Sequence, residues 1–229
     1  MAILQLGGSA GTRVEIGDRL IAAAKTVDVK PVARSFARFK SAHAALKKHE
    51  REARDAEKQL RAAQGDLAAA DLEIDRAVEV LASALVGEGA PRLRPFTAIG
   101  ETQSPSAIRK MKLAAQAKLC LALGKRLERH PAQRVKRAAK ALRDAATKVQ
   151  AAQKPITARQ GAFSEAIAIR LGPEQDWENA FVALKDAARA ARHDGGARIF
   201  STLFEKTAAA RPRPKRQTPA SPAEPVAPS

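Results

Sequence analysis

Hydrophobic residues in the first half of the chain recur every seven positions. Each step of seven from Val32 reaches another apolar residue as far as Leu81, and a small residue, most often alanine, usually stands three positions later. This pattern is typical of a coiled coil whose helices approach closely, because a helix of period 3.6 would lose the register over so many heptads. The apolar positions are Val32, Phe39, Leu46, Ala53, Leu60, Leu67, Ile74 and Leu81.

A second helical stretch runs from about 106 to 171, and heptad spacing with alanine three residues later recurs in it from Val135 onward. Residues 31–86 are expected to pair with this stretch in an antiparallel hairpin. The connecting loop, at about 87–105, is rich in Gly and Pro, which favour turns. The hairpin is therefore expected to occupy residues 31–171.

The packing of large residues against small ones predicts a register for this hairpin. If the loop turns near residue 96, facing residues have numbers that sum to roughly 191. Pro131 and Pro155 lie inside the second stretch and are expected to bend or break it, because proline removes a helix hydrogen bond. The expected pairs are Phe39 with Ala152, Leu46 with Ala145, and Ile74 with Ala117.

Shorter elements flank the predicted hairpin. Residues 1–30 hold ILQL and RVEI around a Gly/Ser/Thr-rich connection, which predicts a small β-hairpin and then a short helix. Pro173 predicts the start of a separate helix, so that two short packing helices occupy 173–209. Residues 210–229 are Pro-rich and Ala-rich, as in disordered tails. The predicted class is all-α: a long antiparallel Ala-rich coiled-coil hairpin with short additional C-terminal helices and a disordered tail.

Composition limits the protein to many small contacts instead of a large aromatic core. Hydrophobic residues make up 45% of the chain, aromatic residues 3%, and about a quarter of the residues are alanine, which buries little area. The single cysteine, Cys120, excludes an intrachain disulfide and fits a reducing compartment. We find no signal peptide and no stretch apolar enough to span a membrane. The expected location is the cytoplasm.

No arrangement of residues predicts reaction chemistry. The four histidines, His43, His49, His130 and His193, lack the Glu three residues earlier that di-iron helical bundles use. The segment GGSAGTR lacks the Lys-Ser/Thr of a phosphate-binding loop. No catalytic residue, metal ligand or cofactor is nominated, so we expect a protein that is not an enzyme.

Charge is the most distinctive feature of the sequence. The formal net charge is +17, and residues 109–159 hold fifteen Lys or Arg against only Glu128 and Asp144. Side chains at Lys125 and Lys136, among others, form one stripe at helical spacing. The predicted register places further cations, near residue 40, at the same end of the hairpin. The expected polyanion-binding residues are Arg34, Arg38, Lys40, Lys47, Lys48, Lys125, Arg129, Lys136, Lys140, Arg143, Lys148 and Lys154, with Arg211, Arg213, Lys215 and Arg216 in the C-terminal tail.

Two functions remain open from the sequence. The first is a scaffold or assembly protein that packs through its coiled coil, alone or as a homo-oligomer, and binds a polyanionic partner such as an acidic protein surface through its basic surface. The alternative is a sequence-independent DNA-binding protein. A solvated face without a partner would show the same charge pattern.

Overall fold

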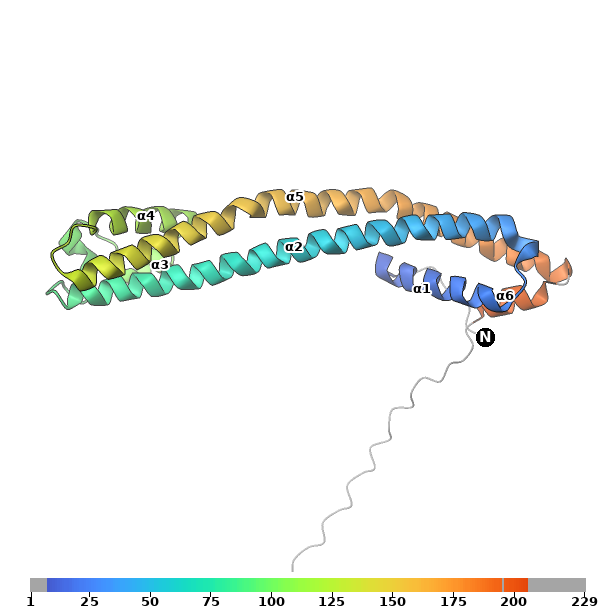
Figure 1. Cartoon of the computed structure of the whole chain (residues 1–229), viewed down its shortest axis with the longest axis horizontal. Helices are drawn as coiled ribbons and strands as arrows, with labels where there is room; N and C mark the ends of the chain where they lie inside the picture. The colour runs from blue at the N-terminus through green and yellow to red at the C-terminus, as the bar shows by residue number, and fades with distance from the viewer. Residues whose placement is uncertain (1–7, 195, 206–229) are drawn as a thin grey trace, which may run out of the picture. The chain divides into compact units, whose positions relative to one another are not determined.

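The computed structural model describes residues 8–194 and 196–205, which consist of helices and their connections (Figure 1). The predicted all-α class, with two long helices packed against each other, is confirmed. The α-helices are α1 (Ala10–Ala23), α2 (Ala33–Val86), α3 (Pro105–Arg109), α4 (Leu113–Arg126), α5 (Gln133–Ala190) and α6 (Ala197–Phe204). Short 3₁₀ helices occupy Ala24–Thr26, Lys30–Val32, Pro95–Ile99 and Ala191–Asp194.

The chain divides into two compact units, and α2 and α5 each contribute to both. Unit 1 comprises Met1–Ala44 and Gln175–Ser229, and unit 2 comprises Ala45–Glu174. The predicted C-terminal tail, 210–229, lies outside the described residues.

In unit 2 the heptad positions of α2 form the contact with α5. Leu46, Leu60, Ile74 and Leu81 are buried, and Leu67 is partly buried. Their partners on α5 include Val135, Leu142 and Val149, all fully buried. The heptad pattern therefore identified the buried face of α2 correctly, because large side chains at this spacing can be covered only by a helix that follows the same seam.

The predicted register of the hairpin is wrong. Lys148 Nζ lies 2.6 Å from Glu73 Oε1, and Arg170 Nη1 lies 2.7 Å from Glu50 Oε2. Facing residues therefore have numbers that sum to about 220 instead of 191. Leu46 consequently does not face Ala145. The turn is centred later in the chain because residues 87–132 fold back at this end of unit 2 as an additional layer.

Helix α4 is the main element of this additional layer (Figure 1). Its Cys120 and Leu123 are fully buried in one cluster with Ile74 and Leu81 of α2 and Val135 of α5. Unit 2 is thus a three-helix bundle where α4 lies beside the long helices. Ile74 packs in this cluster. Because α4 runs in the same direction as α2, Ile74 and the Ala117 of α4 are not paired in an antiparallel hairpin as predicted.

The expected single helix over 106–171 is also corrected. The chain leaves the helix after Arg126 and re-enters it at Gln133, so Pro131 lies in the break between two helices, where its missing N–H is tolerated. By contrast, α5 continues through Pro155 and Pro173, and the expected separate helix from Pro173 is wrong. The carbonyls that lose their donors belong to Ala151 and Ile169, which are exposed, where water can replace the missing hydrogen bond.

The predicted β-hairpin near the N-terminus is wrong where the structure describes it. RVEI, residues 13–16, lies inside α1, while ILQL, residues 3–6, lies outside the described residues. Ser9 caps α1, since its side chain accepts a hydrogen bond from the backbone N–H of Thr12. The Gly/Ser/Thr-rich segment is therefore a helix start, where a short polar side chain satisfies a free N–H.

Unit 1 has the aromatic core that unit 2 lacks. Trp177 stacks on Phe181 with ring centroids 5.2 Å apart, and Phe39 lies 5.7 Å from Trp177. Phe204 of α6 packs edge-on against Phe181. Phe39 therefore faces these rings and not the predicted Ala152, which belongs to unit 2. The helix α6, Ala197–Phe204, thus has its apolar face covered within unit 1.

Candidate polyanion-binding surface

Four of the predicted cations lie together where α4 ends and α5 begins. Lys125 lies in the last turn of α4 and Arg129 in the connection, while Lys136 and Lys140 lie in the first turns of α5. The two helices touch here at Gly124: a Cβ on this residue would lie 2.9 Å from the Ala139 carbonyl oxygen. We call Lys125, Arg129, Lys136 and Lys140 the basic surface.

No described carboxylate forms a salt bridge with a side chain of the basic surface, although Glu128 and Asp144 lie nearby in the sequence. Lys125, Arg129 and Lys140 are exposed, Lys136 is half-buried, and none of the four forms a salt bridge with a described residue. An external anion could therefore bind these four side chains without breaking a salt bridge.

Other predicted cations of unit 2 have acidic partners. Arg143 pairs with Glu128, and Lys148 pairs with Glu73. Both are less available to an external anion than the basic surface, because binding would have to break an existing pair. Lys154 is exposed on α5, farther along the helix.

The structure does not bring Lys47 and Lys48 to the basic surface. In the observed register these residues face the end of α5 that belongs to unit 2, near residue 172, whereas Lys136 faces the opposite end of α2. Arg34, Arg38 and Lys40 lie in unit 1, where Lys40 Nζ stands 5.3 Å from the centroid of the Phe36 ring. Only the incorrect register of 191 grouped them with Lys136. Arg211, Arg213, Lys215 and Arg216 lie outside the described residues.

Two arginines that the sequence analysis did not nominate lie next to the basic surface. Arg134 donates a hydrogen bond of 3.1 Å to the Ala84 carbonyl oxygen and stands 3.8 Å from Glu88. Arg137 is exposed and forms no salt bridge with a described residue. In the sequence, only their place in the basic run 109–159 pointed to these two arginines. The predicted stripe of cations lies on another face of the helix.

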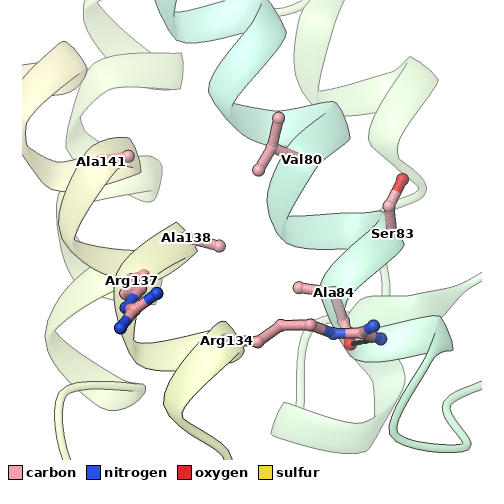
Figure 2. Close-up of a pocket in the computed structure, with 7 residues that line it drawn as sticks. All are labelled: Val80, Ser83, Ala84, Arg134, Arg137, Ala138 and Ala141. Atoms are coloured by element: carbon pink, nitrogen blue, oxygen red, sulfur yellow. Dashed lines mark hydrogen bonds between the residues drawn. The ribbon is translucent and has the colours of Figure 1, made fainter.

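These arginines flank a groove between α2 and α5, shown in Figure 2. Its volume is about 480 Å³. The side chains of Val80, Ala84 and Ala138 point into the gap, and Arg134 reaches across it to α2. We call this the alanine groove; its lining residues are Val80, Ser83, Ala84, Arg134, Arg137, Ala138 and Ala141.

Unit 1 contains a chain of polar side chains that sequence reasoning missed, running from the buried Trp177 and His43 to the exposed Asp18. The indole N–H of Trp177 donates to His43 Nδ1 at 3.3 Å, and His43 Nε2 lies 3.0 Å from Asp18 Oδ1. Because Nδ1 accepts the indole hydrogen bond, Nε2 carries the proton that is donated to Asp18. His43 packs so closely on Gly17 that a Cβ there would overlap its ring. This arrangement joins three helices and gives no open space for a substrate.

Two further groups of unit 2, Cys120 and Arg109, have shifted pKa values. Burial, followed by the charge of Asp75, raises the pKa of the Cys120 thiol to about 12, so the thiol is protonated at neutral pH and inert. Hydrogen bonds to Glu79 and Asp75 raise the pKa of Arg109. Among the described residues no group of three or more His, Cys, Asp or Glu is placed to hold a metal ion.

Helices long and apolar enough to cross a membrane are absent from the described residues. No protein-family model, curated protein or solved structure matches the chain.

Proposed function

We propose that the protein is a non-enzymatic helical scaffold that binds a polyanionic partner through the basic surface of unit 2. One observation carries the proposal: Lys125, Arg129, Lys136 and Lys140 gather at the α4–α5 junction without an acidic partner among the described residues. Elsewhere in this unit, cations such as Arg109 and Lys148 have carboxylate partners. Repulsion at the basic surface is relieved when an anion binds.

The position of the basic surface adds to its attraction for anions. The first turn of α5 has no acidic residue, although the N-terminus of a helix carries a partial positive charge that acidic side chains normally stabilise. Lys136 and Lys140 are four residues apart, a spacing at which like charges destabilise a helix. The helix start and the side chains therefore create a positive potential at one place, which attracts a multivalent anion.

Duplex DNA is the second candidate partner. The basic surface consists of Lys and Arg and contains no aromatic side chain, so it is suited to phosphates and not to stacking on bases. An acidic protein would satisfy the same charges. Self-association through the coiled coil and a cytoplasmic location stay predictions.

The test compares two variants that lose the same charge. The Lys136→Gln/Lys140→Gln variant removes two unpaired cations, whereas Arg51→Gln/Arg61→Gln removes two cations of unit 2 that pair with Asp55 and Glu57. For duplex DNA, log affinity falls with log salt with a slope of about −0.9 per neutralised phosphate, so the first variant should make this slope shallower by about 1.8. The control should leave the slope nearly unchanged.

Affinity is measured by fluorescence anisotropy with duplex DNA and, separately, with polyglutamate. Binding of polyglutamate alone, with the same dependence on Lys136 and Lys140, would assign an acidic protein as the partner. If neither polymer binds at low salt, or if the two variants weaken binding equally, the basic surface is not a binding site.

A further inference from the structure

The alanine groove lies on the side of unit 2 opposite α4. Helix α4 contacts α5 at Ala139 and Arg143 through Gly124, whereas the groove is lined by Arg134, Ala138 and Ala141. Successive residues of a helix are 100° apart, which places these two sets on opposite sides of α5. The pair formed by α2 and α5 therefore has one side covered by a helix and one side open.

The covered side shows how this helix pair binds a third helix. Gln116 of α4, which is buried, donates a hydrogen bond of 2.7 Å to Asp75 of α2. Leu123 inserts fully between the long helices, and Gly124 permits close contact of the backbones. Small residues on the long helices leave space for these side chains, as in ridges-into-grooves packing.

The open side has a similar apolar lining without a cover. Val80 is 55% exposed, although Val78 and Leu81 on the same turn are fully buried. Ala84 and Ala138 form the floor, and Ala141 extends it along α5. Alanines at these positions make the groove shallow enough for the ridge of another helix to approach both α2 and α5.

Arginines give the groove its charge preference. Arg137 is exposed without a salt bridge to a described residue, and Arg134 spans the groove, with Glu88 at 3.8 Å. We propose that the alanine groove binds an amphipathic helix of a partner protein, with small aliphatic residues facing Val80 and acidic residues facing Arg134 and Arg137. This inference rests on the proposed scaffold function and names its partner as an acidic helix.

Charge argues against two other occupants. In a two-fold symmetric dimer the same groove would meet itself, and the arginines of one copy would approach those of the other. A nucleic-acid backbone would satisfy the arginines but would bury neither Val80 nor the alanine floor. An acidic amphipathic helix satisfies both parts of the groove, in the helix-in-groove mode of recognition.

The experiment uses the full chain and a labelled synthetic peptide. The probe is a helix of about 20 residues with Leu or Ala at i, i+3, i+4 and i+7 and Glu beside this stripe. A scrambled peptide of the same composition has the same charge and no stripe. Val80→Glu places a carboxylate in the groove, and Leu72→Glu, at a residue 60% exposed on the same helix, adds the same charge outside it.

We expect the striped peptide to bind the wild-type protein more tightly than the scrambled one. Val80→Glu should weaken this binding by at least about tenfold. The new carboxylate repels the acidic probe, and the substitution removes the apolar contact that Val80 makes. Leu72→Glu should change it by less than about twofold. Binding of duplex DNA or polyglutamate by the basic surface should be equal in the two variants.

Equal affinity for the two peptides, or equal effects of the two variants, would contradict helix binding by the alanine groove. Neither result would contradict anion binding by the basic surface. Sedimentation provides the other decisive readout. A wild-type dimer that Val80→Glu dissociates would identify a second copy as the occupant and overturn the proposal. If the wild-type protein binds the striped peptide but neither polyglutamate nor DNA, this result would contradict the proposed function and support helix binding by the alanine groove.

Discussion

Gly124 and Gly65 are both inside helices of unit 2 but have opposite surroundings. A Cβ at Gly124 would lie 2.9 Å from the Ala139 carbonyl oxygen and 3.1 Å from Arg143 Cβ, whereas a Cβ at Gly65 would meet nothing within 4 Å. At Gly65, glycine only weakens α2, because it adds flexibility to the unfolded chain. At Gly124, the missing side chain allows α4 to contact α5.

The two alanine variants should therefore change stability in opposite directions. We expect Gly65→Ala to raise the free energy of unfolding by about 0.5 to 1 kcal/mol. Gly124→Ala should lower it by about 1 to 3 kcal/mol, since the added methyl group forces the backbones apart. Urea unfolding followed by circular dichroism measures both, and a stabilising Gly124→Ala would show that α4 does not pack on α5 at this point.

At the scale of elements, the register of α2 against α5 can be tested by crosslinking. Cysteines introduced as Glu73→Cys and Lys148→Cys replace a salt-bridged pair, so a short bis-maleimide should join them efficiently within one chain. The native Cys120 is buried and its pKa is raised to about 12, so it should react slowly and give little background.

The control is a pair that only the register of 191 would place face to face. Arg51→Cys and Lys140→Cys are both at exposed positions, and the observed register places them near opposite ends of unit 2, so they should not crosslink within a chain. Mass spectrometry of the digested monomer identifies each product. Efficient joining of this second pair, without the first, would restore the register predicted from the sequence.

The sequence predicts helix faces better than helix partners. Heptad spacing depends on one helix alone, so the buried positions from Leu46 to Leu81 could be read from the chain. Register depends on what fills the turn, and no local pattern indicates that residues 87–132 return as α4. Prolines were equally ambiguous: Pro131 lies in a break between two helices and Pro173 lies inside one, although both have the same local effect on the backbone.

At the scale of the molecule, the sequence placed Lys125 and Lys136 on one helical stripe, whereas the structure places them on two helices, at the end of α4 and the start of α5. The predicted stripe assumed one helix through Pro131, whereas the structure groups these residues because α4 packs beside α5 at Gly124. The alanine groove could not be predicted, because it requires the observed register and the placement of α4 on the other side. Composition indicated the net charge, and tertiary contacts determine which cations remain unpaired.

The division into two units predicts that damage to one core need not unfold the other. Trp177 is fully buried in unit 1, stacked on Phe181 and hydrogen-bonded to His43. Trp177→Ala should lower the stability of unit 1 by about 3 to 5 kcal/mol, because it removes a large buried side chain and leaves a cavity.

Hydrogen exchange followed by mass spectrometry distinguishes local from global unfolding in this variant. Amides of α1 and α6, in unit 1, should lose most of their protection, while those of α4 and of residues 135–149, in unit 2, should keep theirs. Trp177→Phe is the milder comparison, because it retains an aromatic ring beside Phe181 while it loses the hydrogen bond to His43 and part of the buried indole. Equal loss of protection in both units would mean that the long helices α2 and α5 unite the chain into one cooperative structure.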